Sequence, residues 1–217
     1  MLEAAGGFAC FGKGFSFFAQ SVELGSRVDF SRIELAEQRG FKKVVLVGHS
    51  AGWAAVRSYQ AQKQDERVIG MVLASGAVRP ETRQTDPEQL AEATRLRSAS
   101  EEDALVRDPK RSFPSYISAA TFLDIANSPR EYKDFFGVQL TNAPITRIHC
   151  PLLAFFGTRG DVGDESDLEL LKSSIKRQPS GPSRVDTVMI RGGDHMYAGE
   201  EAQVAETIGK WADALTK

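Results

Sequence analysis

The sequence predicts an α/β fold built on a mostly parallel sheet. Apolar runs of four to seven residues recur along the 217-residue chain, and most are followed by a stretch with helical periodicity. Continuous apolar runs indicate strands covered on both faces, as in parallel sheets flanked by helices. The alternation of strand and helix predicts the same class. The predicted strands are residues 43–47, 68–74, 151–156 and 184–190.

Capping residues mark where the predicted helices begin. Asp29 or Ser31 can cap a helix that ends before Gly40, and Asp164 can cap the helix that follows it. Residues 200–215 have an amphipathic pattern and form a helix at the end of the chain. Each of these helices lies next to a predicted strand, as the α/β class requires.

Between Val78 and Ile148 the strand–helix alternation stops. Three short helical patterns occupy this segment, at residues 87–98, 115–127 and 129–136. A run of helices between two strands of one sheet is typical of an insertion rather than of a second domain. We therefore expect a single domain, residues 1–217, that carries a helical lid at residues 79–147.

Composition points to a small-molecule partner. The 27 basic and 29 acidic residues give a net charge of −2, so no strong field favours nucleic acid or an anionic membrane. Cys10 and Cys150 lack zinc-site spacing and the density of a disulfide scaffold. The apolar stretch 8–18 is short and interrupted by Lys13, and no basic n-region precedes it. We expect a cytoplasmic protein without a membrane segment.

The motif G-x-S-x-G occurs where a predicted strand gives way to a helix. Ser50 lies on that turn, and Gly48 and Gly52 are the small neighbours that a sharp, strained turn needs. The backbone N–H of Ala51 lies at the helix N-terminus, where it can donate to an oxyanion. The pattern predicts Ser50 as a nucleophile and Ala51 as an oxyanion donor. The alternative is a glycine-flanked turn that only packs a helix on a sheet.

A serine hydroxyl needs a base to take its proton, and the chain has three histidines. His195 follows the last predicted strand in a glycine-rich loop, so we expect it to be the base. His49 lies inside the turn, where its side chain is expected to point away from Ser50. His149 comes just before a strand. We expect structural roles for both.

A third group, usually a buried carboxylate, orients the imidazole. Asp161 is the first carboxylate beyond the strand at residues 151–156, and we expect it to fill this role. Asp164 is the alternative, although it also has the features of a helix cap. Asp194 is adjacent to His195 in the sequence, and adjacent side chains usually point apart.

These segments resemble the α/β-hydrolase family over nearly the whole chain. GHSAG resembles the nucleophile elbow of that family, GTRGD its acid turn, and GGDHMYAGEE its histidine loop and last helix. The last segment is similar to a dienelactone-hydrolase-like or uncharacterised esterase branch. The resemblance implies cleavage of a carboxylic ester, or a related acyl transfer, through an acyl-serine intermediate. It implies a triad of Ser50, Asp161 and His195, no metal or organic cofactor, and a lid where the helical insertion falls.

The N-terminal part departs from the family pattern. GKGFS, residues 12–16, resembles the loop after the family's fourth strand, so the fold is expected to lack its N-terminal strands. Without the third strand, residues 43–47 lose their usual neighbour and residues 7–11 are displaced. Unpaired backbone of this kind invites aggregation or a rearranged sheet. The H-G motif that supplies a second oxyanion donor is missing, and an amide near Gly12 or Gly14 can replace it.

Other side chains allow more than one interpretation. Trp53 stands where the family usually has a small residue, and its indole can pack in the core, contact the lid or narrow the pocket. We expect core packing. Lid residues can either form an apolar substrate site or hold the lid to the core; they are Phe113, Tyr116, Phe122 and Leu123.

Two other functions are alternatives to a hydrolase. Residues 7–14 fit most of a phosphate-binding loop, but Gly14 offers no hydroxyl to magnesium and only six residues precede the motif. A catalytically impaired hydrolase-like protein, either a binding module or a truncated product, is the more serious rival. The short N-terminal part favours it, and the presence of all three triad residues favours an enzyme.

Overall fold

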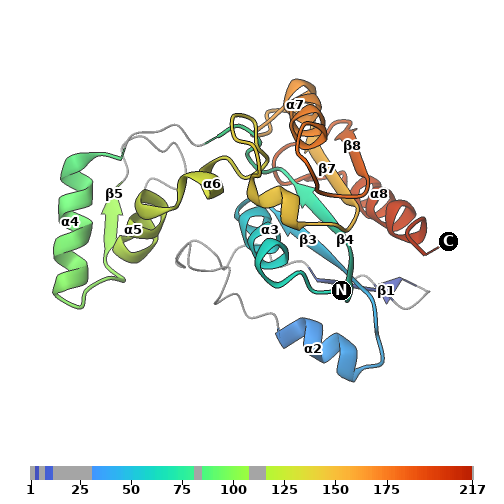
Figure 1. The fold of residues 1–217 in the computed structure, drawn as a ribbon, viewed down its shortest axis with the longest axis horizontal. Helices are drawn as coiled ribbons and strands as arrows, with labels where there is room; N and C mark the ends of the chain where they lie inside the picture. The colour runs from blue at the N-terminus through green and yellow to red at the C-terminus, as the bar shows by residue number, and fades with distance from the viewer. Residues whose placement is uncertain (1–2, 5–7, 12–30, 81–84, 108–115, 217) are drawn as a thin grey trace.

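The computed structural model describes residues 3–4, 8–11, 31–80, 85–107 and 116–216 (Figure 1). Within these residues, six strands form one sheet in the order β1-β2-β3-β4-β7-β8. Only β1 and β2 pair antiparallel; the other neighbours are parallel. The predicted sheet is therefore confirmed. Its strands are β1 (Glu3–Ala4), β2 (Phe8–Phe11), β3 (Val44–His49), β4 (Val68–Ala74), β7 (Leu152–Gly157) and β8 (Val185–Ile190).

Helices cover both faces of the sheet. Residues of α2, α3 and α7 pack in the hydrophobic cluster on one face, and residues of α8 pack in the cluster on the other. Asp164 caps α7, as the sequence predicted. The helices are α2 (Ser31–Gln38), α3 (Ala51–Lys63), α4 (Pro87–Ser98), α5 (Ala119–Asn127), α6 (Arg130–Lys133), α7 (Glu165–Lys176) and α8 (Glu201–Asp213), with a 3₁₀ turn, η1 (Pro144–Arg147).

Successive residues of a strand point to opposite faces of the sheet. In β3, Leu46 belongs to the cluster shared with α3 and α7, whereas Val45 belongs to the cluster shared with α8. Phe156 and Phe155 divide in the same way in β7. Because both faces of the sheet are covered, the central strands β4 and β7 are apolar throughout, which explains their continuous runs in the sequence.

The sheet continues beyond β3 on the side away from β4. β2 pairs with β3 in parallel, and the register joins Ala9 to Val44 and Phe11 to Leu46. Of the outcomes expected for a sheet without its usual third strand, the structure therefore has the rearranged sheet. β2 takes the place of the usual neighbour and supplies the backbone partners of β3 on that side. The loop at residues 12–16 lies outside the described residues.

The insertion lies to one side of the main sheet in Figure 1 and has a hydrophobic cluster of its own. Helices α4 and α5 pack on a two-stranded antiparallel ribbon, β5 (Leu105–Arg107) and β6 (Tyr116–Ser118). The predicted helix over residues 115–127 is correct only from Ala119 onward. β-branched and aromatic residues favour extended backbone in β6, and Ile117 is buried opposite Val106.

The apolar residues of the insertion do not behave as either interpretation expected. Phe122 and Leu123 are buried in the insertion's own cluster, together with Val106 and Ile117. Tyr116 is 55% exposed. Phe113 lies outside the described residues. Phe122 and Leu123 therefore hold the insertion together rather than fixing it to the main core.

Trp53 packs in the main core, as expected. Its side chain is 2% exposed and lies edge-on to Phe136 and stacked near Phe156. A Cβ atom on Gly76 would lie 1.8 Å from the indole, so only glycine fits beside Trp53 there. Phe136 comes from the later part of the segment between β4 and β7, so that part belongs to the main core.

Candidate active site

Ser50 occupies a strained turn between β3 and α3. Its φ is 52°, in the left-handed region that non-glycine residues rarely adopt. The backbone N–H of Ser50 donates to the carbonyl oxygen of Ala74 on the neighbouring strand at 2.9 Å. Although Ser50 stands at the N-cap position, its side chain makes no capping hydrogen bond. The hydroxyl is therefore available to another partner.

The two glycines of the turn have different roles. A Cβ atom on Gly48 would lie 2.6 Å from the carbonyl oxygen of Gly52 and 2.7 Å from Val56, so a side chain there is excluded. A Cβ atom on Gly52 would meet nothing within 4 Å. The sequence predicts the same steric role for both glycines, and the structure supports it for Gly48 alone. The physical reason is that Gly48 lies where β3 packs closely against the start of α3, whereas Gly52 faces open space.

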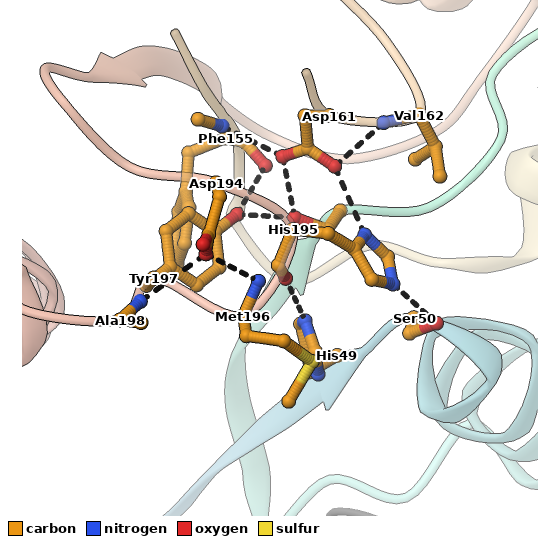
Figure 2. A network of polar contacts seen from close by, with 12 residues as sticks. His49, Ser50, Phe155, Asp161, Val162, Asp194, His195, Met196, Tyr197 and Ala198 are labelled. Atoms are coloured by element: carbon orange, nitrogen blue, oxygen red, sulfur yellow. Dashed lines mark hydrogen bonds and ion pairs between the residues drawn. The ribbon is translucent and has the colours of Figure 1, made fainter. Parts of the chain in front are cut away.

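Ser50, His195 and Asp161 lie side by side at one edge of the sheet (Figure 2). They follow β3, β8 and β7, and the carboxyl ends of these parallel strands meet at that edge. The Nε2 atom of His195 lies 3.0 Å from the Oγ atom of Ser50. Its Nδ1 atom lies 3.1 Å from Oδ1 of Asp161. The structure brings together the three residues that the sequence predicts as a triad.

The carboxylate of Asp161 determines which nitrogen of His195 carries the proton. A carboxylate only accepts hydrogen bonds, so Nδ1 of the neutral imidazole donates to it and Nε2 keeps a lone pair facing Ser50. The Asp161 side chain is fully buried, whereas that of His195 is 33% exposed. This arrangement suits a base that takes a proton from Ser50 and returns it to a group arriving from solvent.

Each oxygen of Asp161 has two donors. Oδ1 accepts from His195 and from the backbone N–H of Val162 at 2.7 Å. Oδ2 accepts from the backbone N–H of Gly157 at 2.7 Å and from the hydroxyl of Ser75 at 2.6 Å. A buried charge is tolerated only when it is paired or hydrogen-bonded, and these four donors meet that condition.

Ala51 is the first residue of α3, so its backbone N–H is among the groups without a partner in the preceding turn. This position, next to Ser50, fits the predicted oxyanion donor. The positive end of the helix dipole adds to the attraction for an anion. Gly12 and Gly14, which were considered for a second donor, lie outside the described residues.

The remaining candidates have other partners. Nε2 of His49 donates to the carbonyl oxygen of His195 at 2.7 Å, so its ring points away from Ser50 (Figure 2). His149 is exposed at the start of β7. Asp164 forms a capping box with Asp167. The carboxylate of Asp194 accepts from two backbone N–H groups of its own loop.

Sequence reasoning missed two hydroxyl groups next to the triad. Ser75 follows β4 directly, and Tyr197 follows His195 by two residues. Their oxygen atoms lie 2.5 Å apart. A polar residue at the carboxyl end of a buried strand is a signal that could have found Ser75, because the strands beside β4 carry Ser50 and Asp161.

Two searches concern other kinds of site. Among the described residues, no three His, Cys, Asp or Glu side chains are grouped to hold a metal ion. In the same part of the chain, no helix has the length and apolar character needed to cross a bilayer. The predictions of a cytoplasmic protein without metal or cofactor stay predictions.

The fold and this edge of the sheet define a class: α/β proteins in which a serine on a strand–helix turn meets a histidine and an aspartate. The sequence matches the alpha/beta hydrolase family over residues 11–207. The chain therefore belongs to the α/β-hydrolase family. No curated protein sequence matches it.

Solved structures share this fold at low sequence identity. One is a monoacylglycerol lipase from Paleococcus ferrophilus, with 18% identity, a TM-score of 0.57 and coverage of 90% of this chain and 76% of that one. A soluble variant of the monoglyceride lipase from Saccharomyces cerevisiae has 17% identity, a TM-score of 0.56 and coverage of 89% and 68%. A thermophilic esterase from Thermogutta terrifontis has 17% identity, a TM-score of 0.54 and coverage of 92% and 74%.

Proposed function

We propose that the protein is a serine hydrolase that cleaves a carboxylic ester of a small molecule through an acyl-serine intermediate. The observation that carries the proposal is the short contact of His195 with both Ser50 and Asp161. Membership of the α/β-hydrolase family and the likeness to solved lipases and an esterase also support it.

The proposed reaction has two halves, the acylation and the deacylation of Ser50, and each group acts once in each half. The Oγ atom of Ser50 attacks the acyl carbon while Nε2 of His195 takes the hydroxyl proton. The carbonyl oxygen becomes an oxyanion and accepts a hydrogen bond from the N–H of Ala51. Collapse of the resulting tetrahedral intermediate breaks the ester C–O bond, and His195 gives its proton to the leaving alkoxide. Water then repeats the cycle, releases the acid and restores Ser50.

The insertion is proposed to act as a lid over this edge of the sheet. Its place in the chain, between β4 and β7, supports this role.

The same chemistry would be an acyl transfer if an alcohol, in place of water, accepted the acyl group. Adding a simple alcohol to the assay and measuring the new ester separates the two reactions.

Hydrolysis of p-nitrophenyl esters of increasing acyl length tests the proposal. We expect release of p-nitrophenol by the wild type and a rate at least about 10³-fold lower in Ser50→Ala. Ser58→Ala, a serine replacement two turns further along α3, is the control and is expected to keep the wild-type rate. No hydrolysis of any ester by the folded wild type would favour the rival, a hydrolase-like binding module.

A further inference from the structure

Ser75 lies in the middle of the site without belonging to the triad. It follows β4, whose neighbours β3 and β7 lead to Ser50 and Asp161. Its side chain is 1% exposed, and its φ of 53° is in the left-handed region. Its N–H donates to the carbonyl oxygen of Phe155 at 3.0 Å. A buried serine held in a costly backbone conformation calls for a physical reason.

The hydrogen-bond chain at Ser75 has only one order of protons when Asp161 is ionised. The carboxylate cannot donate, so the Ser75 hydroxyl gives its single proton to Oδ2 of Asp161. The contact between the two hydroxyl oxygens must then use the proton of Tyr197. Both hydroxyl groups therefore donate toward Asp161. The hydroxyl of Tyr197 also lies 3.3 Å from the carbonyl oxygen of Phe155, so its one proton is shared between Ser75, the nearer acceptor, and this longer contact.

Tyr197 is held as firmly as Ser75. Its φ is 55°, its ring packs edge-on against Phe155 with centroids 5.5 Å apart, and it belongs to the cluster under α8. Burial raises the pKa of Tyr197 far above its usual range; the hydrogen bond with Ser75 opposes this rise in part, and the charge of Asp161 adds to it. The phenol therefore keeps its proton throughout the pH range of an ordinary assay.

We infer that Ser75 and Tyr197 are positioning residues that keep the carboxylate of Asp161 oriented toward His195. The inference rests on the proposed function, because it names the groups that support the triad's acid. Two features of the structure carry it: both hydroxyl groups are buried and donate in one direction, and both residues keep a left-handed backbone at the position that makes the contact.

This role has a signature in the titration of His195. An imidazole is ordinarily more basic than a carboxyl group, so the first proton taken up by the pair goes to His195. The hydroxyl proton of Ser75 offsets part of the negative charge on Asp161. Without it the carboxylate attracts the imidazolium more strongly, so the pKa of His195 rises.

The other titratable groups around the pair stay the same in variants of Ser75. They are His49 on β3, Asp194 and Tyr197 on the loop after β8, and Arg159 on the loop after β7. A change in the titration of His195 on removal of the Ser75 hydroxyl therefore reports the contact with Asp161 and no other charge.

NMR titration of the three histidines in the full chain tests the inference, with Ser75→Ala and Ser75→Gly as a matched pair. Both variants remove the hydroxyl, but only glycine adopts the left-handed backbone conformation without strain. We therefore expect the two variants to differ in stability but to have the same effect on Asp161. We expect the pKa of His195 to rise by about 0.5–1 unit in both. Tyr197→Phe keeps the ring and is expected to give a smaller rise. Ser174→Ala, also at a fully buried serine, is expected to give none.

The acid limb of the pH profile for reaction with a fluorophosphonate is expected to move by the same amount. An unchanged pKa of His195 in both Ser75 variants, or a change that follows their stability rather than the missing hydroxyl, would overturn the inference. If the Ser75 variants show the pKa shifts but the wild type does not react with the probe, the positioning role stands and the proposed function is refuted instead.

Discussion

Nε2 of His195 lies 3.0 Å from Oγ of Ser50, although 145 positions separate the two residues in the chain. Parallel pairing makes this possible, because β3 and β8 end at the same edge of one sheet. The distance is that of a hydrogen bond ready for proton transfer.

Asp161→Asn is expected to lower kcat by roughly 10³–10⁴, because an amide can donate to Nδ1 of His195 and so favours the wrong tautomer. Ester hydrolysis by the purified variant, with its fold checked by circular dichroism, measures the effect. Asp164→Asn is the matched control at the helix cap, and it is expected to lower stability slightly and leave kcat unchanged. Equal losses of activity in both variants would show that Asp161 has no special role.

His49→Ala is expected to lower kcat by about five- to tenfold, which is the rate equivalent of one hydrogen bond worth about 1 kcal/mol. The reason is its bond to the carbonyl oxygen of His195, which holds the loop that carries the base. His149→Ala changes an exposed histidine at the start of β7 and serves as the control. Indistinguishable rates for the two variants would refute the supporting role of His49.

The two glycines of the elbow are expected to respond differently to alanine. Gly48→Ala forces a Cβ atom against the backbone of Gly52, at a cost of about 1–3 kcal/mol or more in the free energy of unfolding. Gly52→Ala has open space, and it is expected to be neutral or to stabilise α3 by up to about 1 kcal/mol. Thermal unfolding of both variants measures the difference. Similar melting temperatures would contradict the packing described for the turn.

Asp65 is expected to make stability depend on pH. Its hydrogen bonds with Arg67 are the main cause that lowers the pKa of Asp65 to about 2, and Tyr59 contributes a further bond. A carboxyl group with a lowered pKa in the folded state stabilises the fold above its unfolded pKa. That stability is lost as the pH falls through the folded value.

Asp65→Asn is therefore expected to lower the free energy of unfolding by about 1–2 kcal/mol at pH 7, with a difference from wild type that shrinks between about pH 4 and pH 2. Urea unfolding at several pH values measures this. Glu169→Gln, in an exposed ion pair on α7, is the control and is expected to have little effect at any pH. A difference between Asp65→Asn and wild type that does not change with pH would contradict the prediction.

The elements that the sequence predicted well are those whose burial leaves a pattern. β4 was predicted over the same residues that the structure shows, because every position faces a covered side of the sheet. Asp164 could be recognised as a cap from its place before a helical pattern. Ser50 could be recognised because a strained serine turn requires small neighbours at fixed spacing.

The parts that could not be predicted depend on contacts distant in sequence. Strand order is a tertiary property, so nothing in residues 8–11 indicated that they pair with β3. β5 and β6 have three residues each, too few to show a period. Ser75 carries no motif, and its role is visible only once β4 lies between the strands that lead to Ser50 and Asp161.

Peptide mass spectrometry after reaction with a fluorophosphonate tests the central claim most directly, because the probe bonds only to an activated nucleophile and releases fluoride. We expect one adduct, on the peptide that contains Ser50, and a much slower reaction in His195→Ala. The role of Ser50 as nucleophile would be contradicted by a folded wild type that remains unmodified, or by a Ser50→Ala variant that is modified as fast as the wild type.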